Sequence, residues 1–168
     1  MGTDIHLFIE YKLGEGDRRA WYSLTRQEFH LTRDYDFFAT LARVRGGEPV
    51  IPDRGFPDDA SQDVCWSYYW WVGDRDGHDG ITWCITHASA DEHVAQGQSS
   101  RHILEGGALV IDDPDAHHPG WLDRAEFHAA IDSAPGVEEK HIELQAVLAA
   151  LDALPTETTP RVVFWFDN

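Results

Sequence analysis

The sequence lacks any hydrophobic run long enough to cross a bilayer, so a transmembrane helix is excluded. Its first residues, MGTDIH, have neither the basic stretch nor the apolar segment of a secretory signal. Cysteine is nearly absent: Cys65 and Cys84 are the only two, and we expect reduced thiols rather than a disulfide. These absences predict a cytoplasmic protein that does not associate with membranes.

Basic residues are scarce as well. The 168 residues include 13 Lys and Arg against 30 Asp and Glu, which gives a net charge of −17. Proteins that bind the phosphate backbone of nucleic acids need clustered Lys and Arg, so direct backbone binding is not expected. The acidic balance favours solubility, a bound cation, a basic partner protein or mimicry of a nucleic acid.

No internal repeat or linker divides the chain, and its composition is typical of a folded protein, with 42% hydrophobic and 12% aromatic residues. A chain of this length can bury a full core. We therefore predict a single globular domain over residues 1–168.

Strand patterns stand at both ends of the sequence. Residues 3–11 alternate apolar and polar side chains, a glycine-rich turn follows, and residues 20–24 resemble a second short strand. Residues 161–166, RVVFWF, form a closing strand. We predict an α+β fold with a mainly antiparallel sheet that pairs the N- and C-terminal strands, and with several helices packed on it. This pairing would bring Asp167 close to Asp4.

Helical periodicity and capping patterns occupy much of the interior. They predict helices at residues 34–44, 60–71, 89–96, 121–131 and 137–154. A strand at 81–87 and a hairpin at 101–111 complete the expected elements. The stretches 45–59 and 112–120 are rich in Gly, Pro or Asp and are expected to be loops.

The first strand carries an unusual polar row. Asp4, His6, Phe8 and Glu10 share one face, because side chains alternate along a strand. Asp4 and His6 could hold a divalent metal, or the carboxylate could orient His6 as a general base. Asp4, His6 and Glu10 are therefore the candidate catalytic residues. The competing interpretation is a solvated face of an antiparallel sheet.

A second candidate lies in the expected loop DDPDAHHPG. His117 and His118 are flanked by Pro and Asp, a favourable setting for metal ligands. With Asp4 and His6 they form the predicted set of ligands for Zn²⁺, Mn²⁺ or Mg²⁺. An exposed acidic loop is the alternative, because no established metal motif is present.

Three further residues are candidates for ligand binding: Arg54, Trp121 and Asp167. Arg54 stands in a Gly- and Pro-rich loop, where it could offer a rigid fork to a phosphate or carboxylate. The alternative for Arg54 is a salt bridge to the neighbouring Asp58 or Asp59.

Several segments together resemble an uncharacterised family of small bacteriophage and phage-derived bacterial proteins. The resemblance is carried by the segments MGTDIHLFIEY, RDYDFFATLARVRGG, RGFPDD, HHPGWLDRAEF and VVFWFDN. The sequence departs from the family pattern at Asp34, where Asn is usual, and in WLD, which replaces W-L-T. The resemblance implies a phage context in the host cell cytoplasm and no particular activity.

Three functions are compatible with these observations. The first is a metal-assisted hydrolase or lyase, such as a phosphoesterase, acting on a small phosphorylated or polar substrate. The second is an anti-defence protein that captures a small ligand such as a nucleotide signal. The third is an acidic mimic of nucleic acid that inhibits a host protein. We prefer the first function, the metal-assisted hydrolase or lyase. The expected partner is a small-molecule ligand or a protein.

Overall fold

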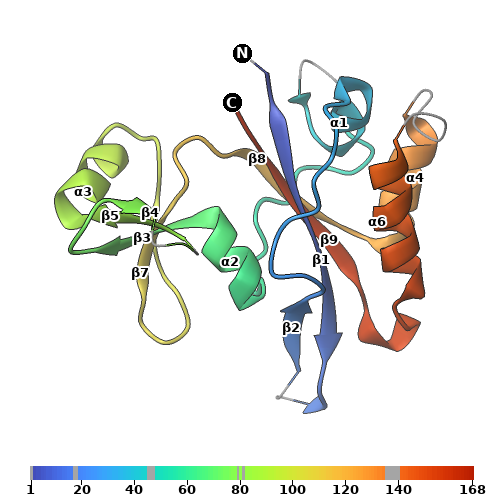
Figure 1. The fold of residues 1–168 in the computed structure, drawn as a ribbon, viewed down its shortest axis with the longest axis horizontal. Coiled ribbons are helices and arrows are strands. Elements are labelled where there is room, and N and C mark those ends of the chain that lie inside the picture. The colour runs from blue at the N-terminus through green and yellow to red at the C-terminus, as the bar shows by residue number, and fades with distance from the viewer. Residues whose placement is uncertain (1, 17–18, 45–47, 79, 81, 135–140) are drawn as a thin grey trace. The chain divides into compact units, whose positions relative to one another are not determined.

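The computed structural model describes residues 2–16, 19–44, 48–78, 80, 82–134 and 141–168. The chain divides into two compact units (Figure 1): unit 1 comprises Met1–Ser61 with His117–Asn168, and unit 2 comprises Gln62–Ala116. The described residues form α-helices and two mainly antiparallel sheets, so the predicted α+β class is confirmed. That residues 1–168 act as one domain stays a prediction. No helix in the described ranges is long and apolar enough to span a membrane.

The sheet of unit 1 joins the two ends of the chain. Its strand order is β2-β1-β9-β8, with β1 at Asp4–Leu13, β2 at Ala20–Ser23, β8 at His117–Asp123 and β9 at Arg161–Asp167. β1 and β9 are antiparallel along their full pairing, from Asp4 opposite Asp167 to Glu10 opposite Arg161. The predicted pairing of the terminal strands is confirmed, and β9 lies in the interior of the sheet.

Three helices pack on one face of this sheet. They are α1 at Tyr35–Leu41, α4 at Arg124–Ser133 and α6 at Ile142–Ala153. Figure 1 shows α4 and α6 side by side, on the same side of the sheet as α1. The core between them is built from apolar side chains of all these elements, among which Leu7, Phe38, Phe127, Val147 and Phe164 are almost fully buried.

Two helix starts follow the capping rules, and the first helix is shorter than the sequence pattern indicated. Asp34 caps α1, and Asp123 with Glu126 forms a complete capping box at α4. The first helix ends at Leu41 rather than residue 44. The last helix begins after His141, which is its N-cap, and the predicted start near Val137 lies outside the described residues.

The second face of β1 is not the polar surface that its sequence suggested. Phe8 and Glu10 are fully buried there, together with Trp165 of β9. Phe56, from the loop before unit 2, packs edge-on against Trp165. β1 is therefore covered on both faces over its central residues, and alternation along the strand did not reveal this.

The stretch 112–120 was expected to be a loop, but its last four residues belong to β8. His117 pairs with Phe166 and Gly120 with Phe164, and a bulge lies between these two pairs. His118, inside the bulge, has a left-handed backbone with φ of 48°. Pro and Gly disfavour strands in sequence patterns, whereas pairing with β9 imposes the strand here.

Unit 2 contains α2 at Gln62–Tyr68, α3 at His87–Ala95 and a sheet of order β4-β5-β3-β7-β6. The strands are Tyr69–Gly73 (β3), Gly77–His78 (β4), Trp83–Thr86 (β5), Arg101–Ile103 (β6) and Leu109–Asp112 (β7). Only β3 and β5 are parallel among these pairs. The predicted strand at 81–87 and hairpin at 101–111 are confirmed.

Two predictions within unit 2 are wrong in detail. The helix expected over residues 60–71 stops at Tyr68, and the aromatic run continues as β3. Aromatic residues favour strands, and pairing with β5 and β7 decides the boundary. The helix expected from Ser89 begins at His87 and is capped by Thr86, whose hydroxyl accepts from the Ser89 amide.

Candidate functional site

The predicted polar row on β1 is divided among three different partners. Asp4 forms a bidentate pair with Arg33, with Nε–Oδ1 and Nη2–Oδ2 distances of 2.5 and 2.6 Å. Hydrogen bonding to Arg33 lowers the pKa of Asp4 and keeps its carboxylate ionised. Asp4 is therefore paired with Arg33 and not with His6, which has other partners.

His6 lies between two carboxylates. Its Nδ1 contacts Glu28, its Nε2 lies 3.1 Å from Oδ2 of Asp167, and its ring stacks on Trp165. Burial opposes the charged ring, but the ion pairs with Glu28 and Asp167 outweigh it and raise the pKa of His6 to about 9. His6 is then protonated at neutral pH, and a protonated imidazole neither accepts a proton nor ligates a metal.

The geometry around His6 also bears on the predicted metal set. Glu28 and Asp167 contact opposite nitrogens of the ring, so their oxygens do not converge with a ring nitrogen on one point. Across the described ranges, no group of three or more His, Cys, Asp or Glu could hold a metal ion. A divalent cation bound to Asp4, His6, His117 and His118 stays a prediction.

Glu10 belongs to a buried ion pair rather than to a pocket with His6. Its Oε2 accepts from Nε of Arg161 at 2.8 Å, and its Oε1 accepts from the Ser61 amide at 2.5 Å. Arg161 also donates to Asp59 and stacks over Trp21, with its guanidinium carbon 3.7 Å from the ring centroid. This arrangement locks β1, β9 and the loop before unit 2 together.

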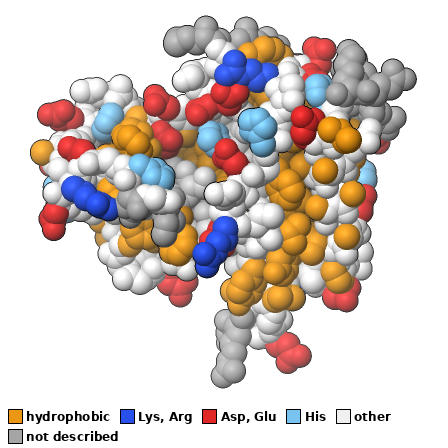
Figure 2. Space-filling model, viewed as in Figure 1, with side chains coloured by type: hydrophobic (Ala, Val, Ile, Leu, Met, Phe, Trp, Pro, Cys, Tyr) orange, Lys and Arg blue, Asp and Glu red, His pale blue; other side chains and the backbone are white. Residues whose placement is uncertain are grey.

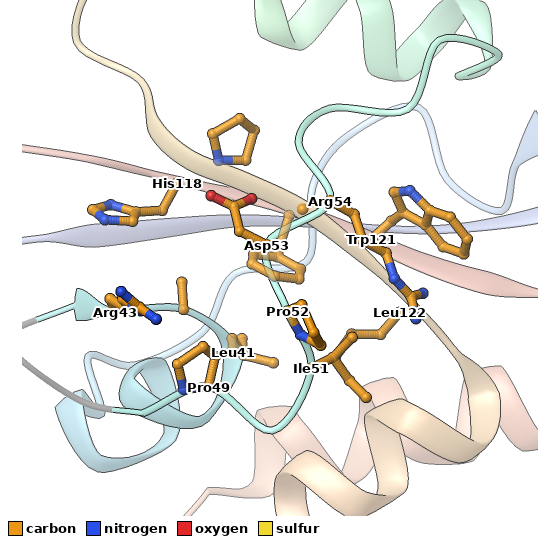
Figure 3. A pocket seen from close by; sticks show the side chains of 14 residues that line it. Leu41, Arg43, Pro49, Ile51, Pro52, Asp53, Arg54, His118, Trp121 and Leu122 are labelled. Atoms are coloured by element: carbon orange, nitrogen blue, oxygen red, sulfur yellow. The ribbon is translucent and has the colours of Figure 1, made fainter.

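A cavity of about 380 Å³ opens in unit 1, between the loop after α1 and the first half of β8 (Figure 3). Most of its wall is apolar, and its polar groups come from Arg43, Asp53, Arg54 and His118. In Figure 3, Arg43 and His118 lie on one side of the cavity and Trp121 lies on the other. The apolar wall is formed by Leu41, Ala42, Pro49, Ile51, Pro52, Pro119, Gly120, Trp121, Leu122 and Phe164.

Arg54 and Trp121, both predicted from sequence as ligand contacts, do line this cavity. The sequence offered Asp58 or Asp59 as the salt-bridge partner of Arg54, and this prediction is wrong. The guanidinium of Arg54 forms a bidentate pair with Glu126, with distances of 2.8 and 2.5 Å. Arg54 also lies over the ring of Trp121 at 4.5 Å. The positive charge of Arg54 is neutralised by Glu126. Arg54 therefore holds the loop against α4 more than it attracts an anion.

The rings of His117 and His118 contact each other through the same type of nitrogen, Nδ1. The Nδ1 atoms of His117 and His118 lie 2.8 Å apart, which requires one proton between them, donated by one ring and accepted by the other. Burial and the neighbouring His118 lower the pKa of His117. His117 stacks on Phe166, so it is held in place while the exposed His118 lines the cavity.

Sequence reasoning missed Arg43, Asp53 and Gly120 as cavity residues. Arg43 lay inside a segment expected to be helical, yet it follows the end of α1 and is exposed. Within the described residues, no carboxylate forms an ion pair with it. No spacing in DYDFFATLAR indicates that Arg43 lines a cavity, because the residues opposite it come from distant segments.

Asp167, the remaining candidate, lies on the rim of the sheet and contacts His6. The structure thus brings His6 and Asp167 together, and separately brings Arg54, His118 and Trp121 together around the cavity. Comparisons of the chain with models of protein families, with curated proteins and with solved structures found no significant match.

Proposed function

We propose that the protein binds a small, largely apolar molecule carrying one carboxylate or phosphate in the cavity of unit 1. The observation that carries this proposal is the composition of the cavity wall: an apolar surface with Arg43 and His118 together on one side. Ligand sites are typically apolar clefts with a few polar groups that fix orientation, and about 380 Å³ is at the small end of their range.

The charge of the site limits the ligand. Arg43 is a cation without a carboxylate partner within the described residues, and His118 can donate a hydrogen bond. Asp53 adds a negative charge, and the chain as a whole carries −17. On the face in Figure 2, acidic side chains are scattered over the surface, whereas Lys and Arg form isolated spots. A ligand with a single anionic group is therefore favoured over a polyphosphate.

The cavity is braced before any ligand arrives. The Arg54–Glu126 pair ties the cavity loop to α4, and Glu126 also accepts from the Asp123 amide at 2.9 Å. Gly120 lets the ring of Phe164 approach the strand closely enough to form part of the wall. A preformed wall reduces the ordering cost of binding.

Matched pairs of probes test this proposal with the full chain. 2-Naphthyl phosphate and 2-naphthoate are each compared with the neutral 2-naphthol by isothermal titration and ligand-observed NMR. We expect each anion to bind at least about tenfold more tightly than its neutral partner, since a charge-assisted contact contributes about 1.5–3 kcal/mol. Equal affinities within both pairs would contradict the proposal that the cavity recognises an anionic group.

Two variants locate the binding in this cavity. Pro52→Trp places a bulky ring at an exposed position of the wall and should abolish binding, whereas Val50→Trp, also exposed and outside the wall, should not. Arg43→Ala should weaken binding of the anions alone, with Arg26→Ala as the control that removes the same charge elsewhere. Binding that survives Pro52→Trp would place the ligand at another site.

A second candidate is catalysis on the bound molecule, and the His117–His118 contact favours it. Nε2 of His118 can give a proton to a ligand group or take one from it while the proton between the two Nδ1 atoms shifts from one ring to the other, as general acid–base catalysis in a hydrolase or lyase requires. Turnover of small phosphate and carboxylate esters should then disappear in His118→Gln while anion binding is retained. Loss of binding without any turnover in the wild type would leave His118 as a binding residue.

A further inference from the structure

Unit 2 contains a cavity of its own, with an unusual lining. It measures about 410 Å³ and is formed by Trp66, Ser67, Trp70, His78, Thr82, Trp83, Asp113 and Asp115. Three of these eight residues are tryptophans and two are aspartates. None of these eight residues is among the catalytic, ligand-binding or metal residues predicted from the sequence.

The tryptophans come from neighbouring elements of one sheet face and one helix. Trp70 on β3 and Trp83 on β5 lie with ring centroids 5.5 Å apart and planes tilted by 42°. His78 on β4 pairs with Trp83 across the strands, at a centroid distance of 6.3 Å. Trp66 closes the set from α2, and its carbonyl accepts from the Thr82 hydroxyl at 2.9 Å. The rings are thus fixed by secondary structure rather than carried on a loop.

The indole of Trp83 is accessible to an occupant of the cavity. Trp83 is 42% exposed, although it is one of the largest apolar side chains. The face of an indole ring carries a negative electrostatic potential, and a cation that lies over such a face is attracted to it. The tryptophan face is the strongest of the aromatic cation sites.

Two carboxylates stand at the same cavity. Asp113 and Asp115 follow β7, and the Asp115 amide donates to Oδ1 of Asp113 at 2.9 Å, which fixes the turn that carries both. Residues 62–116 contain ten Asp and Glu but only two Arg and no Lys. The local field therefore favours a positively charged occupant and disfavours an anion.

We propose that this cavity binds a methylated ammonium group, with Trp66, Trp70 and Trp83 as its aromatic walls and Asp113 and Asp115 as its counter-charges. A methylated ammonium suits this lining better than a metal ion, because its apolar methyl surface packs on indole while its charge is felt by the rings and carboxylates. A bare primary amine is more strongly hydrated and gains less from the indole faces. The proposal concerns unit 2 and does not depend on the cavity of unit 1.

A charge-matched isostere gives the sharpest test. Choline and 3,3-dimethyl-1-butanol have the same shape, but only choline carries a charge. The full chain is titrated with each probe, and binding is measured by calorimetry and by the upfield ring-current shift of the methyl protons. We expect choline to bind at least about tenfold more tightly than the alcohol. Equal affinity for the two probes would overturn the proposal, since it would leave only apolar contact.

Variants then assign the binding to the named residues. Trp83→Phe should retain part of the choline affinity, and Trp83→Leu should lose at least about tenfold, because Leu removes the π face. Asp115→Asn at an exposed position should weaken binding and reduce its salt dependence, whereas Glu105→Gln, an exposed carboxylate outside the cavity, should change neither. Unchanged binding in both Trp83→Leu and Asp115→Asn would contradict the assignment.

The source of the ammonium group is resolved by a parallel titration. A short peptide containing trimethyllysine is compared with the same peptide containing unmodified lysine and with free choline. Choline binding as tightly as the trimethyllysine peptide identifies a free small molecule as the natural type of ligand. A peptide preference of more than about tenfold identifies a side chain of a partner protein. Failure of both choline and the trimethyllysine peptide to bind would overturn the proposal.

Discussion

Glu10 and Arg161 stand directly opposite each other on β1 and β9, and the Glu10 carboxylate accepts from Nε of Arg161 at 2.8 Å. The Glu10 side chain is 0% exposed and that of Arg161 is 5% exposed, so the pair is removed from water. Each member has a second partner: Glu10 accepts from the Ser61 amide, and Arg161 donates to Asp59. The two charges therefore fix the register of the central strands and hold the neighbouring loop.

Removing one member of this pair should be strongly destabilising. Arg161→Met leaves a buried carboxylate with only an amide partner, and we expect a loss of about 3–5 kcal/mol in the free energy of unfolding. Glu10→Leu should cost less, because Arg161 keeps Asp59. The double variant should recover part of the loss. Urea denaturation of the four proteins checks this order, and additive losses in the double variant would contradict it.

The His6 ion pairs predict a specific pH dependence. Because the folded pKa of His6 is raised to about 9 from an ordinary value near 6.5, its contribution to stability is fully present below about pH 6.5 and is lost as the pH rises through 9. The contribution is at most about 3 kcal/mol, and less because Glu28 and Asp167 are partly exposed to screening solvent.

Comparison with His6→Gln isolates this effect. The variant should be less stable than the wild type at pH 6, and the difference should shrink by pH 9.5. Two-dimensional NMR of the imidazole gives the pKa of His6 directly. A difference in stability that is constant from pH 6 to 9.5 would show that folding does not raise the pKa of His6.

Deleting residues 162–168 should prevent folding of unit 1. Phe164, Trp165 and Phe166 are each at most 2% exposed, and β9 pairs with both β1 and β8. Loss of these three side chains alone removes about 2 kcal/mol or more each. Far-UV circular dichroism and thermal melting check this expectation; a truncated chain that still melts cooperatively, with the native spectrum of unit 1, would contradict it.

Gly120→Ala should destabilise unit 1 and distort its cavity. A Cβ on Gly120 would lie 2.8 Å from Cζ of Phe164, a buried ring that cannot move aside freely. We expect a loss of about 1–3 kcal/mol from overpacking. Gly73→Ala is the matched control, since nothing lies within 4 Å of the corresponding Cβ position. Equal melting temperatures for the two variants would show that the Phe164 ring yields.

Part of this architecture could be predicted because it depends on local patterns. Short stretches of sequence are enough to predict the apolar rows of β1 and β9 and the capping residues Asp34 and Asp123. The position of Asp167 opposite Asp4 followed from strand direction alone. These features need no knowledge of what covers the sheet.

The rest depends on contacts between distant residues. Glu10 reads as a polar surface position until Arg161, 151 residues later, is placed opposite it. His118 reads as a loop residue until pairing with β9 makes it part of a bulge. The candidate cavity combines the loop after α1 with β8, and no spacing within either segment indicates that the two meet. Sequence periodicity describes faces, whereas a site arises where separate segments converge.

The central place of β9 has a consequence for synthesis on the ribosome. Residues 62–116 form a continuous segment, whereas the sheet of unit 1 lacks one of its two interior strands until Arg161–Asp167 is made. At ordinary elongation rates the hairpin of β1 and β2 waits on the order of ten seconds for that strand. During this interval the edge of β1 that later pairs with β9 has no strand beside it, so its backbone groups are open to pairing with other strands.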